Sequence, residues 1–284
     1  HASAKSLRSD YVRIAKYRRL FRDDMVFSRR RLVSTDLEAS LEFLKSGSYD
    51  AIYVGSDTVL VLREAYQDQL TPYWLHTSVT GTKFLIAASS HNVTIDTLSN
   101  IQKEQIRSTI QDFRLLGARD EATLRLLSHF TDAGDDRLRL IPDPTFSYDV
   151  DYRFIEKYLE RKRITFDRPV ICLHLLRDSS WAPTLASSFK DRGYIVASLR
   201  PAPYADLILT DLSPFEQMGL YRYFDLVITH RFHDAIFCLK NLTPVIVFPE
   251  RTTDVTSHGE SKIHTLLKSF GLAGLHYIAN KEQL

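Results

Sequence analysis

The segment FDLVITHRFHDAIFCLKNLTPVIVF, residues 224–248, decides the fold of this 284-residue chain. Residues 224–229 form a continuous apolar run that predicts a buried strand, and residues 244–248 predict the next strand. The apolar residues 235–239 between them predict the start of a helix. Strand, helix and strand in this order are typical of a parallel sheet with helical connections. Ligands bind such sheets at the carboxyl ends of the strands, so the polar turn at 230–233 is the first candidate site.

The same alternation of strands and helices runs along the rest of the chain, with Asp36 and Asp120 as expected helix N-caps, a buried strand at 51–56 and a last edge strand at 275–279. It predicts an α/β protein with two Rossmann-like domains that face one cleft. We expect the first domain to cover residues 1–150, a charged linker helix to cover 151–168, and the second domain to cover 169–284. No strand followed by a glycine-rich turn opens the chain, so the first domain is expected to lack its first strand here.

The composition is that of an ordinary globular protein, with 44% hydrophobic and 25% charged residues. A formal net charge of +2 gives no electrostatic case for a nucleic-acid partner. No apolar run approaches the roughly 20 residues that a membrane helix needs. Cys172 and Cys238 both lie in apolar segments, which favours buried thiols over a disulfide or a metal pair. The sequence shows no metal-ligand spacing, so we expect no metal site.

Arg231 and His233 are the candidates for catalysis. Arg231 supplies a planar cation, and His233 supplies a group that titrates near neutral pH. Because they are two residues apart, they can emerge on the same side of an extended segment. The start of the next helix adds backbone N–H groups that favour an anion. His233 alone would fit a structural histidine, but with Arg231 it predicts a turn that holds an anion and moves a proton.

Other strand ends and helix starts carry the candidates for substrate binding. After the strand AIYVGS, a glycine lets a ligand approach the backbone and Ser-Asp can bind hydroxyl groups, although the aspartate could simply cap the turn. An arginine follows the strand FRLLGA, and a lysine at a later helix start opposes the helix dipole. For the arginine and the lysine, the alternative is an ordinary exposed side chain. Asp143, in the segment LRLIPDPTF, fits a structural turn. The candidates are Ser56, Asp57, His91, Arg119, Glu250 and Lys262.

Residues 7–23 predict a basic amphipathic helix. Its polar face carries Arg8, Arg13, Lys16, Arg18, Arg19 and Arg22. A solvated helix face is one interpretation, and contact with an anionic membrane surface or a polyanionic acceptor is the other. We therefore expect a cytoplasmic protein whose helix 7–23 can bring it to the periphery of a membrane.

Five segments together resemble the polysaccharide pyruvyl transferase family. They are YDAIYVGSDTVL (49–60), LGARDEAT (116–123), IPDPTFSYD (141–149), VITHRFHDAIF (227–237) and SKIHTLLKSFGL (261–272). The resemblance runs in order through most of the chain, and the segment around Arg231 and His233 is its most specific part. The glycine- and asparagine-rich first turn of the family is absent from this sequence.

The resemblance implies a glycosyltransferase-B-like fold and pyruvyl transfer from phosphoenolpyruvate to a saccharide, free or carried on a lipid. The product is a pyruvate ketal across two hydroxyl groups. Arg231 and His233 fall on the donor-site arginine and histidine of the family, and Arg119 falls on its other functional arginine. Arginine suits the carboxylate and the phosphate of the donor, and His233 suits a general acid or base. The scheme requires no cofactor and no metal.

Two alternatives stay open on the sequence alone. The first is a glycosyltransferase of the same architecture that uses a nucleotide sugar, with an acidic residue such as Glu250 on the ribose. The second is a saccharide-binding relative without catalytic activity, which the missing first turn allows.

Overall fold

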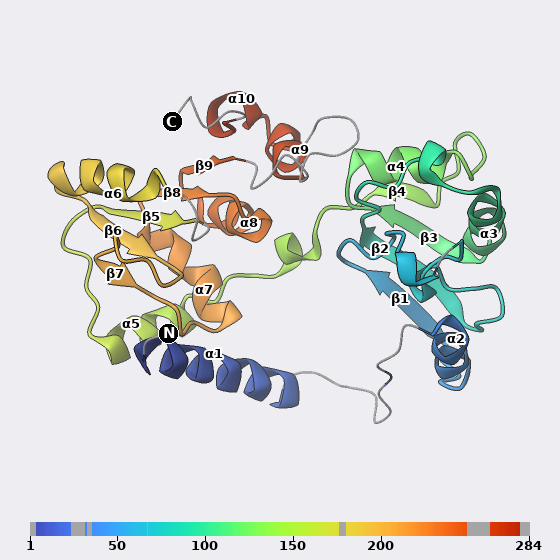
Figure 1. The fold of residues 1–284 in the computed structure, drawn as a ribbon, viewed down its shortest axis with the longest axis horizontal. Coiled ribbons are helices and arrows are strands. Elements are labelled where there is room, and N and C mark those ends of the chain that lie inside the picture. Colours follow the sequence, from blue (N-terminus) through green and yellow to red (C-terminus); the bar gives the residue numbers. More distant parts are fainter. Residues whose placement is uncertain are drawn as a thin grey trace. The chain divides into compact units, whose positions relative to one another are not determined.

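A computed structural model describes residues 4–23, 32, 36–66, 68–175, 180–248 and 262–278. These residues form two compact units (Figure 1). Unit 1 is assigned from His1–Phe27, Tyr148–Asp254 and Ser261–Leu284, and unit 2 from Ser28–Ser147 and Val255–Glu260. Each unit is built on one parallel sheet, so the predicted class of two Rossmann-like α/β units is confirmed.

Unit 1 contains a five-stranded sheet in the order β7-β6-β5-β8-β9. Its strands are β5 (Val170–His174), β6 (Ile195–Ser198), β7 (Leu207–Ile208), β8 (Leu226–Thr229) and β9 (Val245–Val247). Its helices are α1 (Ala4–Asp23), α5 (Arg153–Lys162), α6 (Ala182–Asp191), α7 (Pro214–Leu220), α8 (Phe232–Asn241), α9 (Lys262–Ser269) and α10 (Ala273–His276). The strand order reverses between β5 and β8, which is the position where Rossmann-like sheets bind their ligands.

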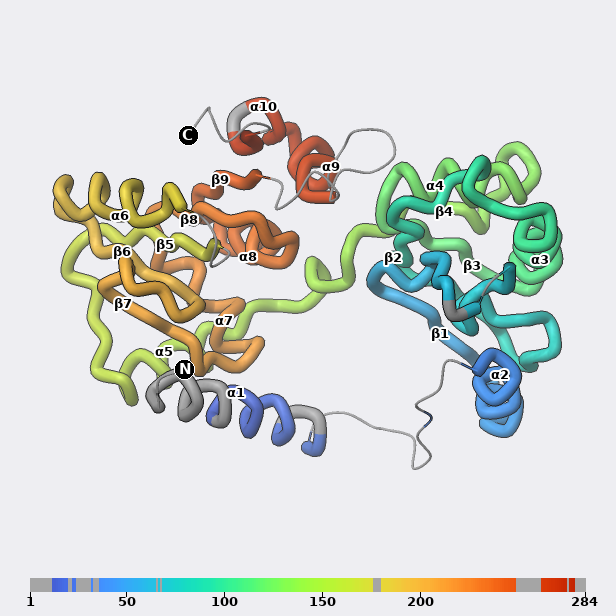
Figure 2. Tube along the Cα trace, in the orientation of Figure 1, coloured from blue at the N-terminus to red at the C-terminus, as the bar shows by residue number. Residues whose placement is uncertain are grey.

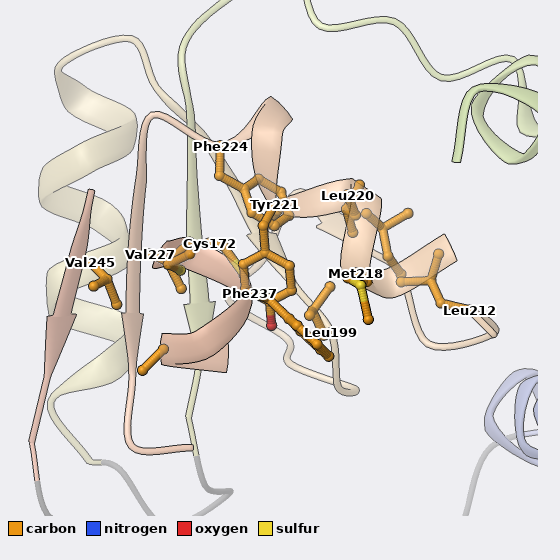
Figure 3. Packing of buried hydrophobic residues seen from close by; sticks show 14 of the residues in the cluster. Cys172, Leu199, Leu212, Met218, Leu220, Tyr221, Phe224, Val227, Phe237 and Val245 are labelled. Atoms are coloured by element: carbon orange, nitrogen blue, oxygen red, sulfur yellow. The ribbon is translucent and has the colours of Figure 1, made fainter. Parts of the chain in front are cut away.

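The alternation of side chains along the strands separates two cores in unit 1. Ile171 and Ile228 face α6, whereas Cys172 and Val227 face the layer of α5, α7, α8 and α9. In this second core the ring centroids of Tyr221 and Phe237 lie 5.4 Å apart, close to Cys172 (Figure 3). The predicted buried thiols Cys172 and Cys238 are confirmed, and burial raises the pKa of both.

Unit 2 contains a four-stranded sheet in the order β1-β2-β3-β4. Its strands are β1 (Ala51–Gly55), β2 (Thr82–Ala88), β3 (Phe113–Ala118) and β4 (Leu138–Leu140), and its helices are α2 (Leu37–Lys45), α3 (Asn100–Ile110) and α4 (Glu121–Ser128). The predicted N-caps Asp36 and Asp120 are confirmed, since their carboxylates accept backbone N–H bonds at the starts of α2 and α4.

Helix α1 packs against unit 1, although the sequence placed it in the first domain. Lys16 Nζ lies 2.5 Å from Glu216 Oε2 and donates a 2.7 Å hydrogen bond to the carbonyl of Asp211. The same ammonium group lies 5.0 Å from the ring centroid of Tyr158 on α5. These long-range contacts join α1 to α5 and to the start of α7, and they also place the predicted linker helix inside unit 1.

Two predictions about strands are wrong. The strand beginning at Ala51 was expected to be buried, but Val54 is its only buried residue and Tyr53 is 67% exposed. The reason is that β1 is the edge strand of the described sheet. The expected final strand at 275–279 is not formed among the described residues: α10 ends at His276, and Tyr277 makes a single bridge to Val247.

Candidate functional site

The carboxyl ends of β5 and β8 meet at the point of reversal in unit 1. The two strands are parallel neighbours, and His174 is paired in register with Thr229, the last residue of β8. From Thr229 the chain passes through His230 and Arg231 directly into α8. The tube in Figure 2 shows β5, β8 and α8 in the same unit. The strand, turn and helix predicted from residues 224–248 are therefore confirmed, and they place Arg231 at the carboxyl edge of the sheet.

Helix α8 begins earlier than predicted. Phe232 is its first residue and Arg231 is its N-cap, so His233 lies in the first helical turn and not in an extended segment. The expectation that Arg231 and His233 emerge on the same side of an extended chain is wrong, because successive residues of a helix turn by about 100°. Both residues are nonetheless exposed at the helix N-terminus. Among the described contacts, the Arg231 side chain makes none that caps the helix.

A histidine–aspartate pair lies beneath this turn. Nδ1 of His174 is 2.7 Å from Oδ2 of Asp234, and the two side chains are 6% and 1% exposed. The Thr229 hydroxyl donates to the same carboxylate oxygen at 2.7 Å and accepts from the backbone N–H of Arg231 at 3.1 Å. The pair thus connects the ends of β5 and β8 to the first turn of α8.

The electrostatics of the pair keep the carboxyl group ionised. Burial alone would raise the pKa of Asp234, but the charge of His174 lowers it. The hydrogen bond from the Thr229 hydroxyl acts in the same direction, and the pKa of Asp234 lies below its ordinary value. A buried carboxylate at the carboxyl edge therefore faces a histidine from the neighbouring strand.

His230, in the turn itself, is buried against the ring of Phe248, with centroids 6.0 Å apart. Burial, and then the positive charges that His174 and Arg231 carry when protonated, lower the pKa of His230 to about 4. At neutral pH this histidine is therefore uncharged, and Arg231 carries the positive charge of the turn.

Sequence reasoning missed His174 and Asp234. His174 lies inside the apolar run VICLHLL, which predicts a strand that continues past it, whereas β5 ends at His174. Asp234 follows His233 directly and lies in the first turn of α8, where an acidic residue is favoured. The pairing itself joins two distant segments and has no local signal.

The carboxyl edge of unit 2 brings together the candidates Asp57 and Arg119, which follow β1 and β3 on either side of β2. Arg119 follows β3, and its guanidinium group lies 3.6 Å from the Asp57 carboxylate and 3.4 Å from Asp143. The Arg119 side chain is 5% exposed, so two carboxylates balance a buried cation. Gly55 is required at the end of β1, because its φ is +156° and a Cβ atom there would lie 1.8 Å from the carbonyl oxygen of Ile86.

The remaining candidates lie at separate places. Ser56 follows β1 beside Asp57, and His91 follows β2 with a φ of 55° and a backbone N–H that donates to the Ser89 hydroxyl. Lys262 is the first residue of α9 in unit 1, as predicted. Glu250 lies outside the described residues. Within the part of the chain that is described, no group of three or more His, Cys, Asp or Glu side chains is placed to hold a metal ion.

A comparison with models of protein families identifies the family of the chain. The model of the family described as polysaccharide pyruvyl transferase matches residues 3–251, which include both carboxyl edges described above. The chain belongs to the polysaccharide pyruvyl transferase family. The family resemblance expected from the five sequence segments is thereby confirmed, and it implies a transferase that acts on a polysaccharide. No curated protein matches the chain significantly.

Two solved structures are similar to the chain. A structure described as a UDP-N-acetylglucosamine 2-epimerase from Listeria monocytogenes is 11% identical, with a TM-score of 0.47, and the match covers 87% of this chain and 70% of that chain. The MnaA–UDP co-structure from S. aureus is 10% identical, also with a TM-score of 0.47, and the match covers 94% and 80% of the two chains.

None of the described helices combines the length and the apolar composition that a membrane span requires.

Proposed function

We propose that this member of the family transfers the pyruvyl group of phosphoenolpyruvate to two hydroxyl groups of a saccharide, forming a pyruvate ketal. The observation that carries the proposal is the position of Arg231. It is the exposed N-cap of α8, at the strand-order reversal of unit 1, in a chain that belongs to a pyruvyl transferase family. A cation and a helix N-terminus at one place suit a donor with a carboxylate and a phosphate.

The chemistry of the transfer requires balanced proton movements. One acceptor oxygen bonds to C2 of phosphoenolpyruvate while C3 gains a proton and becomes a methyl group. The second acceptor oxygen then bonds to C2 as the bond from C2 to the phosphate oxygen breaks. Of the two hydroxyl protons lost, one is balanced by the proton on the methyl group and the other by the proton on the released phosphate. His233 would serve as a general acid or base in these steps.

Arg231 would hold the donor and neutralise the phosphate group as it departs. Arg119 and Lys262 are proposed as further anion-binding residues, while Ser56, Asp57 and His91 are proposed to bind the acceptor. The contact of Arg119 with Asp57 supports a role for this edge of unit 2, because the arginine fixes the position of a carboxylate that can accept hydrogen bonds from sugar hydroxyls.

The exposed residues of helix α1 favour the hypothesis that the acceptor saccharide is carried on a lipid. Lys16 faces unit 1, whereas Arg13, Ile14 and Arg18 are exposed on the same helix. Exposed arginine beside exposed isoleucine suits contact with the anionic surface of a membrane, where a lipid-linked saccharide would lie.

The proposed activity is tested by the release of inorganic phosphate from phosphoenolpyruvate in the presence of a panel of nitrophenyl hexosides and disaccharides. We expect release that depends on one class of acceptor, together with a product in which NMR shows a new methyl group on a ketal carbon. Thermal stabilisation by nucleotide sugars but not by phosphoenolpyruvate, without phosphate release, would instead identify a glycosyltransferase.

A further inference from the structure

The His174–Asp234 pair joins the end of β5 to the first turn of α8, and it also has the composition of a proton-transfer pair. A buried carboxylate 2.7 Å from Nδ1 favours one orientation of the imidazole ring and a proton on that nitrogen. With Nδ1 held by Asp234, Nε2 is the nitrogen of His174 that remains to exchange a proton. The Thr229 hydroxyl, which donates to the same carboxylate oxygen, holds the aspartate in place from the end of β8.

The position of the pair is that of a ligand site. His174 and Thr229 are the final residues of two adjacent central strands, paired in register, at the reversal of strand order. His174, Arg231 and Arg200 interact electrostatically with His230. Basic side chains at or after the ends of β5, β6 and β8 therefore lie near this edge. Asp234 is the buried acidic group that balances them from the α8 side.

The stoichiometry of ketal formation requires more than one proton transfer, and a histidine–aspartate pair can carry out one of them. Two hydroxyl protons must leave the acceptor, while C3 of the donor and the departing phosphate each gain a proton. A base takes the proton from one acceptor hydroxyl as its oxygen bonds to C2. An acid gives a proton to C3 of the donor in the same step. His233, a single exposed residue of the first turn of α8, supplies one of these functions.

We propose that His174 is a second proton-transfer residue of the pyruvyl transfer and that Asp234 is the positioning residue that holds it. In this assignment Nε2 of His174 accepts a proton from an acceptor hydroxyl as the oxygen bonds to C2 of phosphoenolpyruvate. The proton then passes to the phosphate group as the bond from C2 to the phosphate oxygen breaks. The inference rests on the proposed function and adds the identity of its second proton carrier.

The test measures steady-state phosphate release for the wild type, His174→Gln and Asp234→Asn, with phosphoenolpyruvate and the nitrophenyl saccharide that supports release by the wild type. We expect kcat to fall about 10²–10⁴-fold in His174→Gln, while KM for phosphoenolpyruvate stays within about threefold. Asp234→Asn should lower kcat in the same way, because an amide can donate to Nδ1 and so move the ring proton to Nε2.

Two further measurements separate proton transfer from a structural role. Added imidazole should restore part of the kcat of His174→Ala, which a defect of folding would not allow. His276→Gln is the matched control, since Nδ1 of His276 lies 2.7 Å from the carbonyl of Val245 in the same unit, and we expect it to retain wild-type kcat. Circular dichroism and the binding of phosphoenolpyruvate by calorimetry report whether each variant is folded.

The outcomes distinguish the two proposals. A wild-type protein that releases no phosphate with any acceptor overturns the proposed function and this inference with it. An active wild type with an unchanged kcat in folded His174→Gln overturns the inference alone. Loss of kcat without rescue by imidazole, together with lost binding of phosphoenolpyruvate, would identify His174 as a structural residue and also overturn it.

Discussion

The guanidinium group of Arg119 lies 3.4 Å from the carboxylate of Asp143, and both side chains are almost fully buried. Arg119 follows β3, whereas Asp143 lies beyond the end of β4, so the pair connects two neighbouring strand ends in unit 2. The second carboxylate near Arg119 belongs to Asp57, whose side chain is 73% exposed. Burial therefore makes Asp143 the main counter-charge of Arg119.

Asp143→Asn should destabilise unit 2 by about 3–5 kcal/mol, because it leaves a buried guanidinium group without its buried partner. Asp57→Asn should cost less than about 1 kcal/mol, since exposed ion pairs contribute little. The free energy of unfolding in urea measures both, with Trp74 as the fluorescent reporter of unit 2 in a Trp181→Phe background. Equal effects of the two substitutions would contradict the assignment of Asp143 as the counter-charge.

His230 should make unit 1 less stable as the pH falls from about 6.5 to about 4. Its pKa is lowered to about 4 in the folded protein from the ordinary 6.5, so the unfolded chain binds more protons in this window. Stability from this group is therefore fully present above pH 6.5 and is lost as the pH falls through 4. His230→Phe keeps an aromatic ring against Phe248 and should flatten this pH dependence.

Guanidinium unfolding of unit 1 at several pH values measures the effect of His230. Trp181 is a suitable reporter, since its ring also contacts Phe248, with centroids 5.4 Å apart. A pH dependence that is identical in the wild type and in His230→Phe would show that His230 is not the titrating group.

Periodicity in the sequence predicted the α/β class and the central strands of the two sheets, but not the exposure of β1. The runs around Val227 and Leu116 predicted strands that the structure contains, and Asp57 and Arg119, both predicted to follow strands, lie 3.6 Å apart at one edge of the sheet. The rule that ligands bind at strand ends was not applied to His174, because it lies inside a run whose neighbours on both sides are apolar.

Long-range contacts account for what the sequence could not predict. Helix α1 was assigned by chain order to the first domain, yet the pair of Lys16 with Glu216 attaches it to unit 1. The start of α8 was placed too late, because the prediction followed apolar residues only. Asp234 is polar, but it is buried beside His174 and belongs to the first helical turn.

Exposed charges on α1 should determine the binding of the protein to anionic membranes. Each arginine near such a surface contributes about 1 kcal/mol, so reversing the charges of Arg13 and Arg18 to glutamate should weaken binding more than tenfold. Cosedimentation with vesicles of phosphatidylserine and phosphatidylcholine measures the effect, and vesicles of phosphatidylcholine alone are the lipid control. Reversal at the exposed Arg192 of unit 1 is the matched variant. Equal losses in both variants would indicate a general charge effect rather than a surface on α1.

Arg231→Ala should raise KM for phosphoenolpyruvate by roughly 10–100-fold, because a charge-assisted hydrogen bond to the donor contributes about 1.5–3 kcal/mol. Arg231→Lys keeps the charge but loses the planar fork, so we expect an intermediate KM. Binding of phosphoenolpyruvate by calorimetry and steady-state phosphate release measure the two effects, with Arg192→Ala as the control. An unchanged dissociation constant for phosphoenolpyruvate in Arg231→Ala would exclude Arg231 from the donor site.

His233→Ala should retain the binding of phosphoenolpyruvate and lose about 10²–10⁴-fold in kcat, as expected for removal of a general acid or base. His233 is exposed in the first turn of α8, and its ring contacts are with Phe232 and Phe237, at centroid distances of 5.6 Å and 6.5 Å. His233→Phe preserves aromatic packing at this position, so a loss of kcat in both variants would arise from the missing imidazole and not from packing. Wild-type kcat in His233→Phe would leave His174 as the proton carrier of the site and remove His233 from the mechanism.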